Sequence, residues 1–430
     1  METTAEPRYQ GQARKKINEV FAWWGRDLAE ASAKGEPIVH MYGGWNNIVE
    51  LFRSFGFRVL MGEVLACQPA AKKEAPRYIA YAEEVLGYST DICGFHLIDV
   101  ARMVGNLGHP MGQIPKPSLA VVNNSCIPTI KWSEMVSRQC GVPTVTFDVP
   151  HLPTGGALMD PSSVEYQAMH RYIVTQLREA TRVCERITGK KFDEDKLAEL
   201  QSYSNRMLEL WSQIMNLNRG KPSVFDSMAD GVNYIGIFGF RGTKLGVEYL
   251  ELLLQELQER RDLGIEPVPG ERFRLITDGL PCYPYMRPWV SLFHKWKATF
   301  VWSHYNSFVG GGAERGFRFD TSRPLEALAD YFLALTRGDG GPTHMFAHFE
   351  WPQLAQKYQA DGVVLHITKS CRIGSATYPD WRERLAAEGI PCLLLESDIV
   401  DPRYYSEAQL KNRVDAFMES LDRKRLQAVV

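Results

Sequence analysis

A chain of 430 residues is longer than one ordinary hydrophobic core supports, so we expect two or three domains. Hydrophobic residues make up 45% and charged residues 23% of the chain, as in soluble globular proteins, and the formal net charge of −2 with scattered Lys and Arg argues against a nucleic-acid partner. The N-terminal stretch has no apolar signal region, and no apolar run is long enough to cross a membrane. We therefore expect a cytoplasmic protein without a membrane partner.

The first part of the chain alternates predicted helices with short apolar strands. An amphipathic helix over 9–34 ends at Gly35, and Gly43 and Gly44 later form a β-α turn or let the backbone approach a ligand. Strands are predicted at 37–41, 118–122 and 144–149, a further apolar segment at 58–64, and helices at 48–55, 76–86 and 97–104. This pattern predicts an N-terminal helical segment over 1–35 and a first α/β domain over 36–156.

Residues 157–232 have helical periodicity and almost no strand signal, with a break at Gly189. We expect a helical connector here, with Cys184 in its core. Beyond it, strands are predicted at 273–276, 298–302, 363–367 and 392–395, and helices at 244–263, 324–335, 351–358, 379–388 and 407–421. This alternation predicts a second α/β domain over 233–430. The expected fold is thus α/β, with two Rossmann-like parallel-sheet domains and additional N-terminal and connecting helices.

Three of the eight cysteines share one context. Cys93, Cys126 and Cys371 each lie between an apolar segment and a following helix. Because ligands bind at the carboxyl edges of parallel sheets, two facing sheets could bring the three thiols into one cleft. Three thiolates would repel one another unless zinc or an iron–sulfur cluster held them, and Lys369 and Arg372 would favour such an anionic group. No C-x-x-C pair is present, so small buried thiols are the alternative.

Most other enzyme motifs are absent. The sequence has no GxxxxGK[ST] loop, which predicts no ATP binding by a P-loop, and no GxGxxG, HExxH or GxSxG motif. Residues 310–312 are three glycines that could cradle a phosphate or form a plain turn. Arg241, at the start of a helix, could bind an anionic substrate group or cap the helix. His151 and His304 follow predicted strands and could transfer protons or be hydrogen-bonded structural histidines.

Several motifs in order along the chain carry a family resemblance. The stretch ADGVVLHITKSC, followed by IPCLLLESDIVDPRYYSEAQLKNRVDAFMESL, resembles the [4Fe-4S] subunits of the benzoyl-CoA reductase and (R)-2-hydroxyacyl-CoA dehydratase superfamily. GYSTDIC, the strand leading to Cys126 with its downstream KW, FRGT at 240–243 and ADYFL at 329–333 match as well. The FRGT segment and the DPRY with KNR ending resemble most the larger non-ATPase subunit of ATP-dependent benzoyl-CoA reductase.

The resemblance implies that Cys93, Cys126 and Cys371 bind a [4Fe-4S] cluster between two α/β domains of similar topology, leaving one iron open. It also implies a heterodimer with a homologous [4Fe-4S] subunit, separate ATP-hydrolysing activator subunits, and ferredoxin as the upstream electron donor. Single low-potential electrons would pass to an acyl-CoA substrate, whose thioester carbonyl holds a ketyl radical. In the reductase an aromatic ring is reduced, whereas in the dehydratases the radical expels an α-hydroxyl group.

Other functions stay open on the sequence. One is an (R)-2-hydroxyacyl-CoA dehydratase subunit that uses the same cluster. Another is a cluster-binding electron carrier without acyl-CoA chemistry, and a zinc protein is the residual alternative. The resemblance also leaves open whether this chain binds the substrate or relays electrons, since both subunits carry three cysteines.

Overall fold

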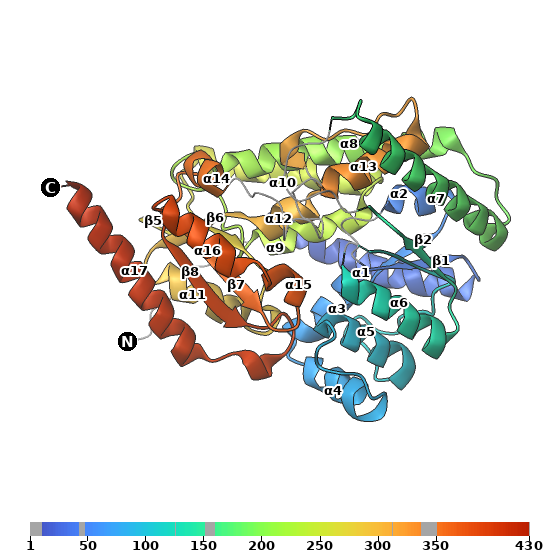
Figure 1. Cartoon of the computed structure of the whole chain (residues 1–430), viewed down its shortest axis with the longest axis horizontal. Coiled ribbons are helices and arrows are strands. Elements are labelled where there is room, and N and C mark those ends of the chain that lie inside the picture. The colour runs from blue at the N-terminus through green and yellow to red at the C-terminus, as the bar shows by residue number, and fades with distance from the viewer. Residues whose placement is uncertain are drawn as a thin grey trace.

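The computed structural model describes residues 11–42, 48–124, 126–150, 160–311, 313–336 and 351–429. Two four-stranded sheets, each parallel throughout, organise the chain (Figure 1). The first contains β1 (Ile38–Met41), β2 (Arg58–Met61), β3 (Leu119–Asn123) and β4 (Thr144–Phe147); the second contains β5 (Phe273–Asp278), β6 (Ala298–Ser303), β7 (Gly362–Thr368) and β8 (Cys392–Ser397). The α/β fold class with two Rossmann-like sheets is confirmed.

The two sheets have the same strand order. The first runs β2-β1-β3-β4 and the second β6-β5-β7-β8, so in each sheet the first and third strands are central neighbours. The second strand pairs on one side of the first strand, and the third strand pairs on the opposite side. The direction in which strands are added therefore reverses between the first and third strands, which creates a switch point there. Crevices at the carboxyl ends of strands beside such switch points are the usual ligand sites of open α/β sheets. The fold thus offers two similar crevices, one in each sheet.

Helices precede and follow the strands of the first sheet along the chain. They are α1 (Gln12–Ala33), α2 (Val49–Ser54), α3 (Gly62–Ala71), α4 (Ala75–Ala80), which continues as a π-helix over Tyr81–Val85, α5 (Gly94–Gly105) and α6 (Ile127–Cys140). The apolar segment predicted at 58–64 divides into β2 and the start of α3. The helix predicted at 97–104 starts earlier, directly after Cys93. Both differences move a helix N-terminus to the carboxyl edge of the sheet.

A layer of long helices follows the first sheet. It comprises α7 (Val164–Thr188), α8 (Glu194–Leu217), α9 (Gly231–Tyr234), a 3-10 helix over Ile235–Phe240 and α10 (Lys244–Asp262). The break between α7 and α8 lies at Gly189, as predicted, and Asp193 caps α8 by accepting a hydrogen bond from the Lys196 amide at 2.8 Å. Cys184 is fully buried in this layer, which confirms its place in the core. Because α8 packs against both α2 and α10, the proposed division at residues 156 and 232 stays a prediction.

The second half of the chain contains seven further helices among the described residues: α11 (Met286–His294), α12 (His304–Val309), α13 (Pro324–Thr336), α14 (Trp351–Lys357), α15 (Arg372–Ser375), α16 (Tyr378–Ala387) and α17 (Glu407–Val429). It also has 3-10 turns at Tyr283–Tyr285, Ala313–Arg315 and Pro402–Tyr404. α13 packs against α7 and α8. The sequence did not predict α11, because Pro284 and Pro288 interrupt the helical pattern at its start. Figure 1 shows α17 along the outer flank of the second sheet and α15 at the junction of the two halves. Within the described residues, no helix is both long and apolar enough to span a membrane.

Candidate functional site

Cys126 and Cys371 occupy equivalent positions in the two sheets. Each is the third residue beyond the third strand of its sheet, since β3 ends at Asn123 and β7 at Thr368. Each is also the residue that precedes a helix, α6 in the first half and α15 in the second. The repeated strand order therefore places one thiol at the carboxyl edge of each sheet.

Cys93 supplies a third thiol at a helix start. It precedes α5 and lies in the same hydrophobic cluster as Val400, which belongs to the second half of the chain. Gly94 makes this approach possible, because a Cβ at that position would lie 2.4 Å from the Val400 side chain. The backbone around Cys93 therefore lies at the boundary between the halves.

The three thiols lie close enough for their charges to interact. Burial raises the pKa of Cys93 well above its ordinary value, and the charges of Cys371 and Cys126 raise it further. Burial and the charge of Cys371 likewise raise the pKa of Cys126. Burial raises the pKa of Cys371 to about 11, while the Gly374 amide acts in the opposite direction. The structure thus brings together the three cysteines that the sequence singled out.

Three cysteine thiols are a donor set suited to a soft metal centre. Among the residues that the structure describes, no three His, Cys, Asp or Glu side chains lie close enough to hold one metal ion. The thiolates of a four-iron cube bind different irons, so they lie farther apart than the ligands of one ion. All three cysteines are free thiols at helix starts, where backbone amides favour negative charge. The donor set therefore fits a [4Fe-4S] cluster, while the ligand role of each cysteine stays a prediction.

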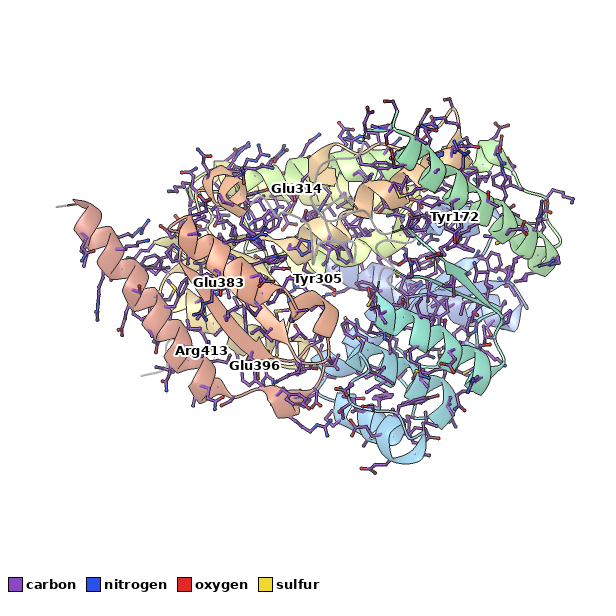
Figure 2. The ribbon with its side chains drawn as sticks, in the orientation of Figure 1. Tyr172, Tyr305, Glu314, Glu383, Glu396 and Arg413 are labelled. Atoms are coloured by element: carbon purple, nitrogen blue, oxygen red, sulfur yellow. The ribbon has the colours of Figure 1, made fainter. Side chains whose placement is uncertain are left out.

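Polar groups that the sequence did not single out flank the thiols. Glu63, in the first turn of α3, is close enough for its charge to raise the pKa of both Cys126 and Cys371. The Tyr283 and Tyr305 hydroxyls are 3.1 Å apart. Figure 2 shows Tyr305 in the middle of the molecule, between the two halves. These residues follow strands β2, β5 and β6, and no local pattern in the sequence distinguishes them from ordinary core residues.

Cys67, in α3, completes this group. It is hydrogen-bonded to Tyr283, although burial dominates and raises the pKa of its thiol. Burial and the nearby charges of Cys67 and Glu63 raise the pKa of Tyr305 well above its ordinary value. Tyr305 and Cys67 are therefore uncharged hydrogen-bonding groups at neutral pH.

On the second sheet, the carboxyl edge carries a hydrogen-bonded group around Asp278. The His304 Nδ1 lies 2.7 Å from Asp278 Oδ1, and His304 is only 5% exposed. Tyr378 is hydrogen-bonded to the same carboxylate, and the charge of Asp278 raises the pKa of Cys371. His304 is thus a hydrogen-bonded histidine close to the thiols, and its proton-transfer role stays a prediction. The other candidate, His151, lies outside the described residues.

Arg241 lies elsewhere, in the protein interior. It is 2% exposed and its Nε donates a hydrogen bond to Glu50 Oε1 at 2.6 Å. This environment favours an internal ion pair over binding of a substrate anion. Gly310 packs where a Cβ would overlap Trp211, which favours a close-packed turn over a phosphate cradle.

Of the two cations expected beside Cys371, the structure describes the side chain of Lys369 only. Lys369 is 44% exposed and pairs with Glu396 at 2.9 Å. Its charge is therefore neutralised at the surface, so Lys369 contributes little to an anionic group below the surface. The Arg372 side chain lies outside the described part of the structure.

Fold and site together define an α/β protein whose two similar parallel sheets gather three cysteine thiols, each at a helix start, near the sheets' carboxyl edges. The chain belongs to the family described as 2-hydroxyglutaryl-CoA dehydratase, D-component, whose model matches residues 45–421.

Several curated proteins resemble the chain over almost its whole length. A benzoyl-CoA reductase subunit of Thauera aromatica is 31% identical, with 93% of this chain and 92% of the relative covered. The (R)-phenyllactyl-CoA dehydratase alpha subunit of Clostridium sporogenes is 26% identical, with 96% and 97% covered. The (R)-2-hydroxyglutaryl-CoA dehydratase alpha subunit of Acidaminococcus fermentans is 25% identical, with 98% of each chain covered. The family is thus one of enzyme subunits, as the resemblance implied.

Proposed function

We propose that this chain is the iron–sulfur subunit of an ATP-dependent aromatic acyl-CoA reductase of the benzoyl-CoA reductase type. Cys93, Cys126 and Cys371 would bind its [4Fe-4S] cluster. The observation that carries the proposal is the convergence of three free thiols, each at a helix start, from both halves of the fold. The 31% identity with the benzoyl-CoA reductase subunit of Thauera aromatica supports the reductase as the first candidate.

When bound, the cluster supplies single low-potential electrons to the thioester-activated ring. The protein excludes water from the region of the thiols, since Cys93 is only 8% exposed and Tyr305 only 4% exposed. The hydroxyls of Tyr283 and Tyr305 remain protonated at neutral pH, because burial raises the pKa of both. They can donate hydrogen bonds, and a proton, to a substrate next to the thiols. His304, oriented by Asp278, offers a second proton-holding group on the other sheet.

Partner proteins follow from the same proposal. The word "subunit" in the names of the relatives supports a partner subunit, which we propose to be a homologous second [4Fe-4S] subunit. We propose separate activator subunits for ATP hydrolysis, in keeping with the lack of a P-loop motif in this sequence. Ferredoxin is the proposed donor to those subunits, and an acyl-CoA is the substrate.

A second candidate is a subunit of an (R)-2-hydroxyacyl-CoA dehydratase. The match to the dehydratase family model and the similarity to the (R)-phenyllactyl-CoA dehydratase alpha subunit favour it. The same cluster and the same proton-holding groups would serve this reaction. Turnover separates the two: reduction of benzoyl-CoA to a cyclic diene supports the first, and dehydration of a 2-hydroxyacyl-CoA supports the second. A cluster that forms without either turnover, in the presence of the activator and the second subunit, supports an electron carrier.

The proposal is tested first by iron and acid-labile sulfide analysis, with electron paramagnetic resonance, on protein purified without oxygen. About four irons and four sulfides per chain are expected for one cube. Zinc in their place, or no metal after reconstitution with iron and sulfide, would overturn the proposal.

A further inference from the structure

A cavity of about 440 Å³ opens between the two halves of the chain. One wall comes from Arg14 on α1 and from the end of α3, and the opposite wall from the region of α9 and from α11. Its volume falls in the range of small-molecule and cofactor sites, about 300–1,000 Å³. Neither Arg241 nor the three thiols line it, and Tyr283 is the residue that it shares with the polar group beside the thiols.

The cavity is strongly basic. Arg14, Lys73 and Arg287 line it, and none of the three forms an ion pair with any residue in the described ranges. Within those ranges no Asp or Glu lines the cavity. The fourth basic residue, His294, is already hydrogen-bonded to Asp226 at 3.0 Å. Three cations around one cavity that form no ion pair within the described ranges are suited to a ligand that carries several phosphate charges.

Lys73 is held in position before any ligand arrives. Its backbone has φ 61°, a left-handed conformation that is uncommon outside glycine. Its Nζ lies 4.2 Å from the centre of the Tyr285 ring, which is itself stacked on Tyr405 with ring centroids 4.0 Å apart. This cation–π contact fixes the ammonium beside the cavity without neutralising its charge.

The cavity is partly apolar and borders the polar group beside the thiols. Met228, Val232 and Val290 line it, and so does Tyr283. Behind Tyr283 lie its hydrogen-bonded partners, Tyr305 and Cys67. A ligand in this cavity therefore contacts cations, apolar side chains and Tyr283, which belongs to the polar group beside the cysteines.

We infer that this cavity binds the phosphate-bearing end of the acyl-CoA substrate. Arg14, Lys73 and Arg287 bind the phosphates, and the pantetheine arm runs along the apolar wall past Tyr283 toward the thiols. The assignment rests on the proposed function, since it needs an acyl thioester as substrate. It locates the anion-binding residues that the sequence alone had sought at Arg241.

The test measures binding of coenzyme A by isothermal titration calorimetry to the full chain, prepared without oxygen together with any protein that copurifies. Lys73→Gln and Arg287→Gln should each weaken binding about tenfold, because each removes a charge-assisted contact to phosphate. The matched control is Arg413→Gln, an exposed residue on α17 at the outer flank (Figure 2), which should leave the affinity unchanged. 3′-Phospho-ADP, which has the phosphates of coenzyme A without its pantetheine arm, should bind at least about tenfold more weakly than coenzyme A.

Two outcomes would overturn the assignment. Unchanged affinity in both variants would show that coenzyme A binds elsewhere, and equal affinity for 3′-phospho-ADP would show that the apolar wall holds no pantetheine. In iron-loaded protein either result would leave the proposed function standing. Absence of iron and sulfide would instead overturn the proposed function, whatever the calorimetry shows.

Discussion

Arg241 and Glu50 form a bidentate ion pair in the protein interior, with Nε 2.6 Å from Oε1 and Nη2 3.0 Å from Oε2. Glu50 belongs to α2, beside the first sheet, and Arg241 precedes α10. Ser204 of α8 donates a hydrogen bond to Glu50 at 2.6 Å, and the Tyr331 hydroxyl contacts the guanidinium. The pair and its two hydrogen-bond partners thus join four helical elements, since Tyr331 belongs to α13.

Arg241→Ala should lower the free energy of unfolding by about 3–5 kcal/mol, because it leaves the buried Glu50 carboxylate unpaired. Urea unfolding followed by circular dichroism measures this, and exposed Arg413→Ala should stay within about 0.5 kcal/mol of the parent. A stable Arg241→Ala protein with weakened coenzyme A binding would contradict the structural role and restore Arg241 as an anion-binding residue.

Cys126→Ser and Cys371→Ser should each yield protein that lacks iron and labile sulfide, because each removes a proposed ligand. Cys184→Ser is the matched control, since Cys184 is equally a free thiol but is fully buried in α7. It should keep its iron and lose about 1–3 kcal/mol of stability, the cost of burying a hydroxyl group. Iron loss in Cys184→Ser with retention in Cys371→Ser would refute the ligand assignment.

Tyr305→Phe should lower kcat on the acyl-CoA substrate by about a hundredfold, the lower end of general acid contributions, and leave the iron content and KM nearly unchanged. The reason is that the variant removes a hydroxyl beside Tyr283 without changing the apolar packing. Tyr172→Phe removes a hydroxyl bonded to Asp148 at 2.8 Å on the outer face of α7, and should not change kcat (Figure 2). If kcat is also unchanged in Tyr305→Phe, Tyr305 is a packing residue.

His40 makes stability depend on pH. Burial lowers its pKa to about 4; the Asp99 carboxylate, 3.4 Å away, opposes this effect, while the charge of Arg102, on the same helix as Asp99, adds to it. The unfolded chain therefore binds a proton near pH 6.5 that the folded chain does not, so stability falls as pH drops below 6.5. From this residue alone the loss at pH 5.5 is about 1.4 kcal/mol. Urea unfolding of the parent and of His40→Gln at pH 7.5 and 5.5 checks this: the parent should lose more stability than the variant, and equal losses would contradict the prediction.

Local sequence determined the elements. Buried β-branched runs such as 363–367 and capping residues such as Asp193 influence the backbone only a few residues away. Periodicity and turn chemistry therefore predicted every strand of both sheets except β2. The β2 region was predicted only as an apolar segment. The same local signal singled out Cys93, Cys126 and Cys371, because a cysteine between an apolar strand or segment and a helix start can be recognised within a dozen residues. Helix α11 escaped prediction because its prolines hide the periodicity.

Tertiary structure decided what those elements do together. Whether Arg241 meets a substrate or a carboxylate depends on Glu50, which lies 191 residues away, and only the fold brings the two together. The same holds for Arg14, Lys73 and Arg287, whose cavity has walls from both halves of the chain. The sequence by itself does not show which group a charged side chain pairs with. Its partner is set by packing between distant elements, because electrostatic and hydrogen-bond energies depend on distance in space and not along the chain.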